Sequence, residues 1–168
     1  MPDLIIHLAA SRLAALPSRS EPLRLGLLLG AALPDVTAKG LVYLTASPTW
    51  FVMTTHAPLV YLVIAYAASL LFDARERRPL FAGLVAGGWL HLLVDYGKDH
   101  LMPRTLPLFF PFRIDLYEGG WYHSETSVYA TIPALALFVV LGFVERRLGR
   151  VRPADAAGRP GTGPGTRR

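Results

Sequence analysis

The chain alternates between long apolar runs and short polar breaks. Charged residues and proline make up the breaks "PSRSEP" (17–22) and "DARERR" (73–78), and Pro34-Asp35 closes another apolar run. Apolar runs bounded in this way are typical of helices, and Pro58 suits a first helical turn. The pattern therefore predicts about five helices, over residues 4–16, 23–33, 56–72, 79–96 and 126–144.

The remaining stretches are predicted to be non-helical. Residues 97–125 form a mixed loop that contains "LPLFFPF" (106–112), whose prolines and aromatic residues suit a segment at a membrane interface. Residues 151–168 are rich in Gly, Pro and Arg, and we expect them to be disordered. The chain is thus divided into a helical membrane domain over residues 1–150 and a basic tail over residues 151–168.

The composition indicates a membrane protein or an unusually apolar core. Hydrophobic residues make up 52% of the chain and charged residues only 17%, against about 25% charged residues in soluble proteins; the mean hydropathy is +0.37. Residues 126–144 carry no charge and are long enough to span a bilayer. Gly83, Gly87 and Gly88 would let neighbouring helices approach closely. We therefore expect an all-α, small multi-pass membrane protein.

The distribution of basic residues predicts its orientation. The net charge is +5, and arginines gather at the ends of apolar runs instead of alternating with aromatic residues, so no nucleic-acid partner is expected. If the helices alternate in direction, thirteen of the 17 Lys and Arg residues share one side, and Lys39, Lys98, Arg104 and Arg113 lie on the other. The positive-inside rule then places the Arg-rich side and the C-terminus in the cytoplasm.

The same alternation brings five metal-capable side chains to one end of the bundle. His7 begins the first predicted helix, and Asp35 ends the second. His56 begins the third, while His91 and Asp95 end the fourth. His91 and Asp95 share one helical face because they are four residues apart. The chain has no cysteine, so a bound metal must use His, Asp or Glu, and these five residues are the predicted ligands.

Such a ligand set has a definite chemistry. Nitrogen and carboxylate ligands without sulfur suit Zn²⁺, which we favour, or Mn²⁺ or Fe²⁺, and the set has room for one to three ions. Two ions about 3.5–4 Å apart can clamp a phosphoryl group and generate hydroxide near neutral pH, with Asp95 as a bridging ligand. Two carboxylates only partly neutralise two divalent ions. The net positive charge that remains favours an anionic or lipid-like substrate, such as a phosphoester or a lipid-borne phosphate.

Each of the five residues also has a purely structural interpretation. His7 suits an interfacial histidine, Asp35 a turn, and His56 the cap of the next helix. His91 and Asp95 can hydrogen-bond to each other without a metal. Ionisable groups within apolar helices are costly and tend to be functional, which favours the metal interpretation for this last pair.

Three further polar residues lie in or beside the loop at the same end of the predicted bundle. They are His100, His123 and Glu125. Each can supply a further ligand, a general acid or nothing, and the sequence does not decide between these roles.

The motifs "LPD" (33–35), "TTHAPL" (54–59) and "GGWLHLLVD" (87–95), followed by "LPLFFPF", resemble the bacterial inner-membrane metal-dependent hydrolase family. Their order is also similar to that of the zinc-dependent phospholipase C and nuclease superfamily. The resemblance covers about residues 4–115. It implies a multi-pass protein of the bacterial inner membrane with metal ligation by His7, Asp35, His56, His91 and Asp95. The family often has a second acid or a histidine at the positions of residues 36–38, and a serine at the position of Ala57. This chain departs from the family at both places.

Three functions follow from this interpretation. We expect a membrane-bound, metal-dependent hydrolase in which His91 and Asp95 carry catalysis and metal-activated hydroxide attacks a phosphoester. The alternative is a non-catalytic membrane protein with a structural metal site or a partner-binding surface. A transporter or channel subunit ranks third, because it needs ligands spread through the membrane depth. The sequence leaves the oligomeric state open.

Overall fold

The structure is a computed structural model of the 168-residue chain, and it describes residues 2–45, 55–99, 107–113, 115, 117 and 119–150. Apart from two short strands, the regular structure in these residues is helical, which confirms the predicted all-α class. The helices are α1 (Pro2–Ala15), α2 (Glu21–Thr45), α4 (Pro58–Ser69), α5 (Ala74–Gly97) and α6 (Ser124–Arg150). The strands are β1 (Lys98–Asp99) and β2 (Tyr122–His123), which pair in parallel. The predicted disorder of residues 151–168 lies outside the described residues.

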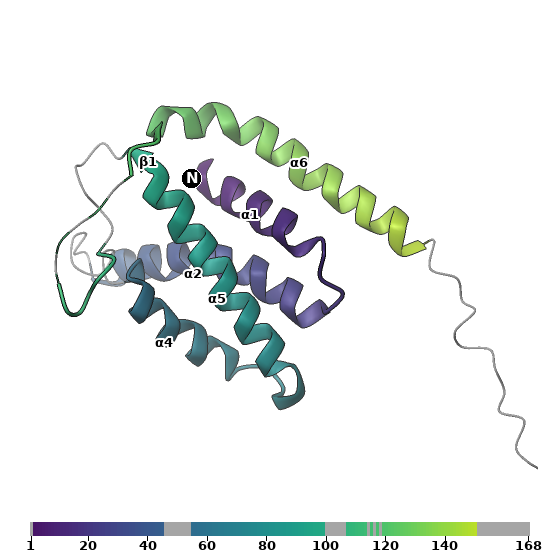
Figure 1. Ribbon diagram of the computed structural model, residues 1–168, viewed down its shortest axis with the longest axis horizontal. Helices are drawn as coiled ribbons and strands as arrows, with labels where there is room; N and C mark the ends of the chain where they lie inside the picture. Colours follow the sequence, from purple (N-terminus) through teal and green to yellow (C-terminus); the bar gives the residue numbers. More distant parts are fainter. Residues whose placement is uncertain are drawn as a thin grey trace, which may run out of the picture.

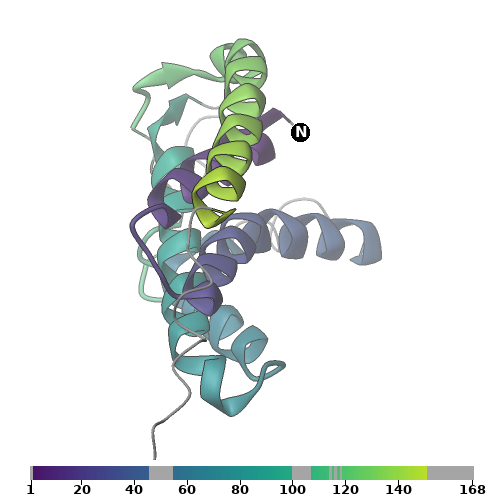
Figure 2. The ribbon, with the colours of Figure 1, turned by 90° about the vertical axis from the view of Figure 1, so that its right-hand side faces the viewer.

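The helices gather around α5. Figure 1 shows α5 crossing the centre of the molecule, with α1 and α6 side by side and α4 at the opposite edge. α5 contacts α1, α2 and α4, while α6 packs mainly against α1. In the view of Figure 2 the C-terminal part of α2 extends away from the other helices. The end of α5 and the start of α6 are joined by the β1–β2 pair.

Glycines set the distance between α2 and α5. A Cβ atom added at Gly26 or Gly30 of α2 would meet the backbone of α5, at Leu80 and Leu84 respectively. Gly83 and Gly87 of α5 face the backbone of α2 in the same way. Both helices thus carry small residues four apart, the spacing that allows close backbone approach. The predicted close approach at Gly83 and Gly87 is confirmed.

The buried face of α4 is built around one tyrosine. Tyr61 is fully buried and packs in a cluster with Ala65, Leu80 and Leu84. Its hydroxyl donates to the Leu84 carbonyl oxygen at 2.7 Å, and its ring fills the space in which a Cβ atom of Gly88 would lie. A buried hydroxyl with this partner stabilises the docking of α4 on α5.

Replacing Tyr61 with Phe tests this contact. The ring volume is kept, but the hydrogen bond to Leu84 is lost, so we expect a decrease of about 1–2 kcal/mol in the free energy of unfolding. Unfolding in mixed micelles, followed by circular dichroism, measures the change. Tyr66→Phe is the matched control, because the Tyr66 side chain is 56% exposed and should be neutral within about 0.5 kcal/mol. Equal stability of Tyr61→Phe and the wild type would contradict this account.

The second helix does not end at Pro34, as the sequence predicted, but continues to Thr45. Proline removes the N–H that would bond to the Gly30 carbonyl, and the Tyr61 hydroxyl lies 3.4 Å from that oxygen. Downstream of the proline, the Thr37 hydroxyl donates to the Leu33 carbonyl oxygen at 2.8 Å. The Gly30 carbonyl thus has a polar neighbour on α4, and the Thr37 hydroxyl adds a bond within α2 just after the proline.

The start of α5 also differs from the prediction. The sequence placed a break at residues 73–78, whereas the helix begins at Ala74 and contains Pro79. Pro79 is the sixth residue of α5, beyond the first turn, so its ring costs the helix the bond to the Arg75 carbonyl oxygen, and the helix continues past this single loss. Glu76 in the first turn also suits the positive end of the helix dipole.

Two helices in the described part of the chain are long and apolar enough to cross a membrane. They are α5 over Ala74–Gly97 and the Glu125–Arg147 part of α6. The second agrees with the predicted span over residues 126–144. α1 and α4 are shorter apolar helices.

Candidate metal centre

Side chains from α1 and α5 meet in a buried group. His7 Nε2 lies 3.2 Å from Asp95 Oδ1, and His91 Nε2 lies 3.1 Å from Asp95 Oδ2. The two imidazole rings stack with their centroids 3.8 Å apart. Both histidines are almost fully buried, whereas 14% of the Asp95 side chain stays exposed. Because the ligand atoms of all three residues lie within 4.8 Å of one another, the group can hold a metal ion.

The backbone of α2 fixes which nitrogen of His91 is free. Nδ1 lies 2.7 Å from the Ala31 carbonyl oxygen. A carbonyl only accepts hydrogen bonds, so Nδ1 carries a proton and donates. In the neutral ring Nε2 then presents its lone pair towards Asp95. Donation of one ring N–H to a backbone carbonyl is the usual arrangement of a histidine whose other nitrogen binds metal.

The free nitrogen of His91 fits a cation. Nε2 is buried and has no hydrogen-bond partner among the described residues, although Asp95 Oδ2 lies 3.1 Å away. A buried polar atom in this state is costly, and two facing lone pairs repel each other. A metal ion that contacts Nε2 and a carboxylate oxygen removes both costs, as does a proton on Nε2 that is donated to Asp95. The donor set of two imidazoles and one carboxylate suits Zn²⁺, Mn²⁺ or Fe²⁺.

A second group of potential ligands shares His91. Asp35, His56 and His91 also place their ligand atoms within 4.8 Å of one another. His56 Nε2 lies 3.7 Å from Asp95 Oδ2, and the His56 Nδ1 lies 3.2 Å from the Thr55 hydroxyl. The structure therefore brings together all five residues that the sequence singled out, while their role as ligands stays a prediction.

The position of Asp35 corrects one step of the sequence interpretation. Asp35 was expected at the end of the second helix, but it lies within α2. One turn later, Lys39 places its ammonium Nζ 3.1 Å from Asp35 Oδ2. Sequence analysis missed this pair. Its signal is the spacing of four between an acid and a lysine, which matters only if the helix continues past Pro34.

The other residues considered in the sequence stand apart from these two groups. His123 lies on β2 and Glu125 in the first turn of α6, and both are exposed. Neither belongs to the two His/Asp groups found in the described part of the chain. His100 lies outside the described residues.

Comparisons with known proteins leave this geometry as the main basis for function. No family model matches the chain, and no curated protein or solved structure matches it either. The resemblance to the bacterial inner-membrane hydrolase family therefore stays a prediction drawn from short motifs.

Proposed function

We propose that this protein is a membrane-bound, metal-dependent hydrolase of phosphoesters, with a lipid-borne phosphate as its substrate class. The observation that carries the proposal is the buried His7–His91–Asp95 group, in which the free nitrogen of His91 faces a carboxylate. With His91 neutral, the group leaves a buried polar atom without a partner among the described residues, and a cation would satisfy it; with His91 protonated, the imidazolium pairs with Asp95 instead.

Each residue of the group would have a distinct role. His7, His91 and Asp95 would hold the ion, and the Ala31 carbonyl would keep His91 in the required tautomer. A divalent ion supplies Lewis acidity and lowers the pKa of a coordinated water to about 7. Asp95, the most exposed of the three, would mark the side from which a substrate reaches the ion. His56 lies beside it and is placed to complete the ligand set or to accept a proton.

The surface of α6 supports a membrane location. Large apolar side chains are exposed along most of its length and on more than one helical face, with Val128, Ile132 and Val139 on one face and Tyr129, Leu137 and Val140 on others. Water does not tolerate such a continuous apolar surface, whereas lipid does. We propose a multi-pass protein of the bacterial inner membrane.

The opposite end of α1 supports the proposed orientation. Arg12 donates to the Phe138 carbonyl oxygen at 3.1 Å, and it forms an ion pair of 2.9 Å with Glu145. Arg24 pairs with the same carboxylate. These contacts fasten α1 and α2 to the late part of α6, several turns from the start of that helix beside the β1–β2 pair. The positive-inside rule then leads us to propose a cytoplasmic C-terminus.

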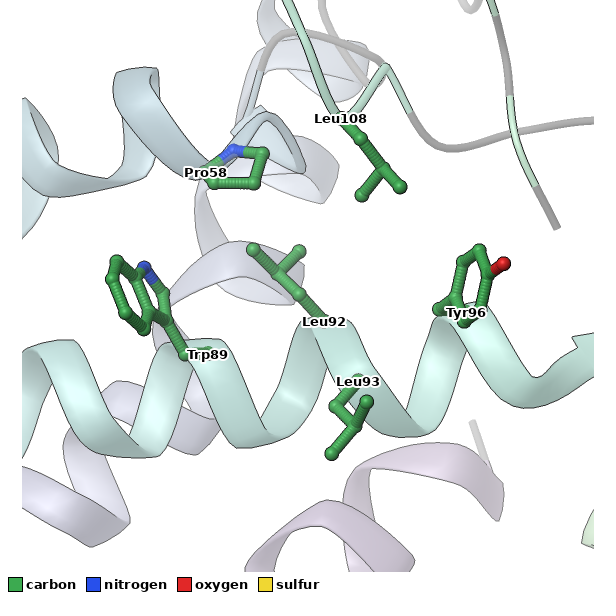
Figure 3. A pocket seen from close by; sticks show the side chains of 6 residues that line it. All are labelled: Pro58, Trp89, Leu92, Leu93, Tyr96 and Leu108. Carbon is green, nitrogen blue, oxygen red and sulfur yellow. The ribbon is translucent and has the colours of Figure 1, made fainter. Parts of the chain in front are cut away.

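An apolar groove lined by neighbours in the chain of His56, His91 and Asp95 favours a lipid-like substrate. The groove has a volume of about 370 Å³, and most of its lining comes from one face of α5, as Figure 3 shows. It is lined by Pro58, Trp89, Leu92, Leu93, Tyr96 and Leu108. Pro58 follows His56 by two residues, and Tyr96 adjoins Asp95 in the chain. An acyl chain in this groove would therefore bring its headgroup towards the His/Asp groups.

A hydrolase assay tests the proposal. The purified protein, loaded with Zn²⁺ or Mn²⁺ in detergent, is given a chromogenic phosphodiester and a short-chain phospholipid. We expect metal-dependent turnover by the wild type and a loss of at least about 100-fold in Asp95→Asn. His123→Ala is the control, because it removes an exposed histidine outside the two groups. Equal turnover by the wild type and Asp95→Asn would refute the proposal.

One observation favours a second candidate, a structural metal site. His7 and His91 are only 2% and 1% exposed, and a closed site with saturated ligands stabilises a fold without turning over substrate. In that case metal would raise the melting temperature of the protein, and no phosphoester in the panel would be hydrolysed. Metal-dependent hydrolysis would exclude this candidate. The two ligand groups share His91 and so lie together, which does not favour the ion path of a transporter.

A further inference from the structure

A fixed positive charge lies at the edge of the candidate metal centre. The Lys39 ammonium is 3.1 Å from Asp35 Oδ2, and the two residues are one turn apart on α2. Only 17% of the Asp35 side chain and 38% of the Lys39 side chain are exposed, so solvent screens the pair less than a surface ion pair. The carboxylate that would serve the second ligand group is therefore already neutralised by a cation of the chain.

The ligand atoms also limit the number of ions. The Nδ1 of His91 is bonded to Ala31, so this residue offers a single free nitrogen although it belongs to both groups. One lone pair serves one ion. If the His7–His91–Asp95 group is filled, only Asp35, His56 and the second oxygen of Asp95 remain for another ion.

We propose that the centre binds one divalent ion and that the Lys39 ammonium takes the place of a second cation at Asp35. One divalent ion, Lys39 and the two carboxylates together carry one net positive charge, and a second divalent ion would raise it to three. Positive charges held close together in a partly buried site repel one another strongly. The partly exposed ammonium, with its remaining donors, then binds the anionic oxygens of a substrate phosphate. This inference rests on the proposed function.

The number of ions per chain tests the inference directly. The full-length protein in detergent is equilibrated with Zn²⁺ at a buffered free concentration and analysed by mass spectrometry of the metal. We expect one equivalent in the wild type and in Lys39→Arg, which keeps the charge. Lys39→Met frees Asp35 and should bind two equivalents, and the added change Asp35→Asn should return the count to one. Circular dichroism verifies that the variants keep the helical content of the wild type.

The outcomes separate this inference from the proposed function. Two equivalents in the wild type, or one equivalent in Lys39→Met, would overturn the role of Lys39 and leave the hydrolase proposal intact. No specifically bound metal in the wild type would overturn both.

Discussion

Replacing Asp95 with Asn should weaken the binding of a divalent ion by at least about 100-fold, since changes even to groups behind the metal ligands cost about 10–100-fold. Asp95 connects the three histidines of the centre. Its Oδ1 faces His7, and its Oδ2 faces His91 and is the oxygen nearer to His56. Asn keeps the shape of the side chain but removes the negative charge. Competition with a chromophoric chelator measures the metal affinity of the purified protein.

Two substitutions serve as controls for this result. Glu125→Gln removes an exposed acid outside the two ligand groups and should leave metal affinity unchanged. Asp35→Asn should weaken metal binding by less than about 10-fold, because Lys39 already neutralises that carboxylate. If Asp95→Asn binds metal as tightly as the wild type, the carboxylate is not a ligand.

Replacing Gly87 with Val should lower the free energy of unfolding by at least about 3 kcal/mol, the upper part of the usual range for overpacking. An added Cβ atom at this position would collide with the backbone of Leu27, which cannot move aside as a flexible side chain can. α2 and α5 would have to separate. The Ala31 carbonyl would then lose His91, and metal affinity should fall together with stability.

Gly40→Ala is the matched control for the glycine substitution. Gly40 also lies in α2, but among the described residues no atom outside its own stretch of helix lies within 4 Å of an added Cβ. Alanine should stabilise the helix there by up to about 1 kcal/mol, since glycine is the weaker helix former. Unfolding in mixed micelles, together with the chelator titration, follows both variants. A Gly87→Val protein with the stability and metal affinity of the wild type would show that close approach of α2 and α5 is not required.

Much of the fold could be predicted because the governing signals are local. Long apolar runs, charged breaks and Pro58 predicted about five helices. The alternation of helix direction also predicted that His7, Asp35, His56, His91 and Asp95 converge. That prediction survived an error in the length of the second helix. To place a residue near one end of the bundle, only approximate helix bounds are required.

The errors came from tertiary packing. Pro34 ends a helix by local rules, but within the fold it is buried and the helix continues past it. The tautomer of His91 depends on Ala31, which lies sixty residues away in the chain. The Lys39–Asp35 pair forms only because α2 is longer than predicted. The spacing of four indicates the Lys39–Asp35 pair only once the helix is known to continue past Pro34, and no local pattern indicates the contact between His91 and Ala31.

X-ray absorption at the metal edge is the most direct test of the central claim, that His7, His91 and Asp95 bind one divalent ion. The wild-type protein is loaded with zinc in detergent and washed before measurement. We expect a first shell of imidazole nitrogens and carboxylate oxygen at about 2.0–2.2 Å, with the scattering pattern of at least two imidazole rings. A shell of oxygen alone, or no zinc retained after washing, would contradict the claim.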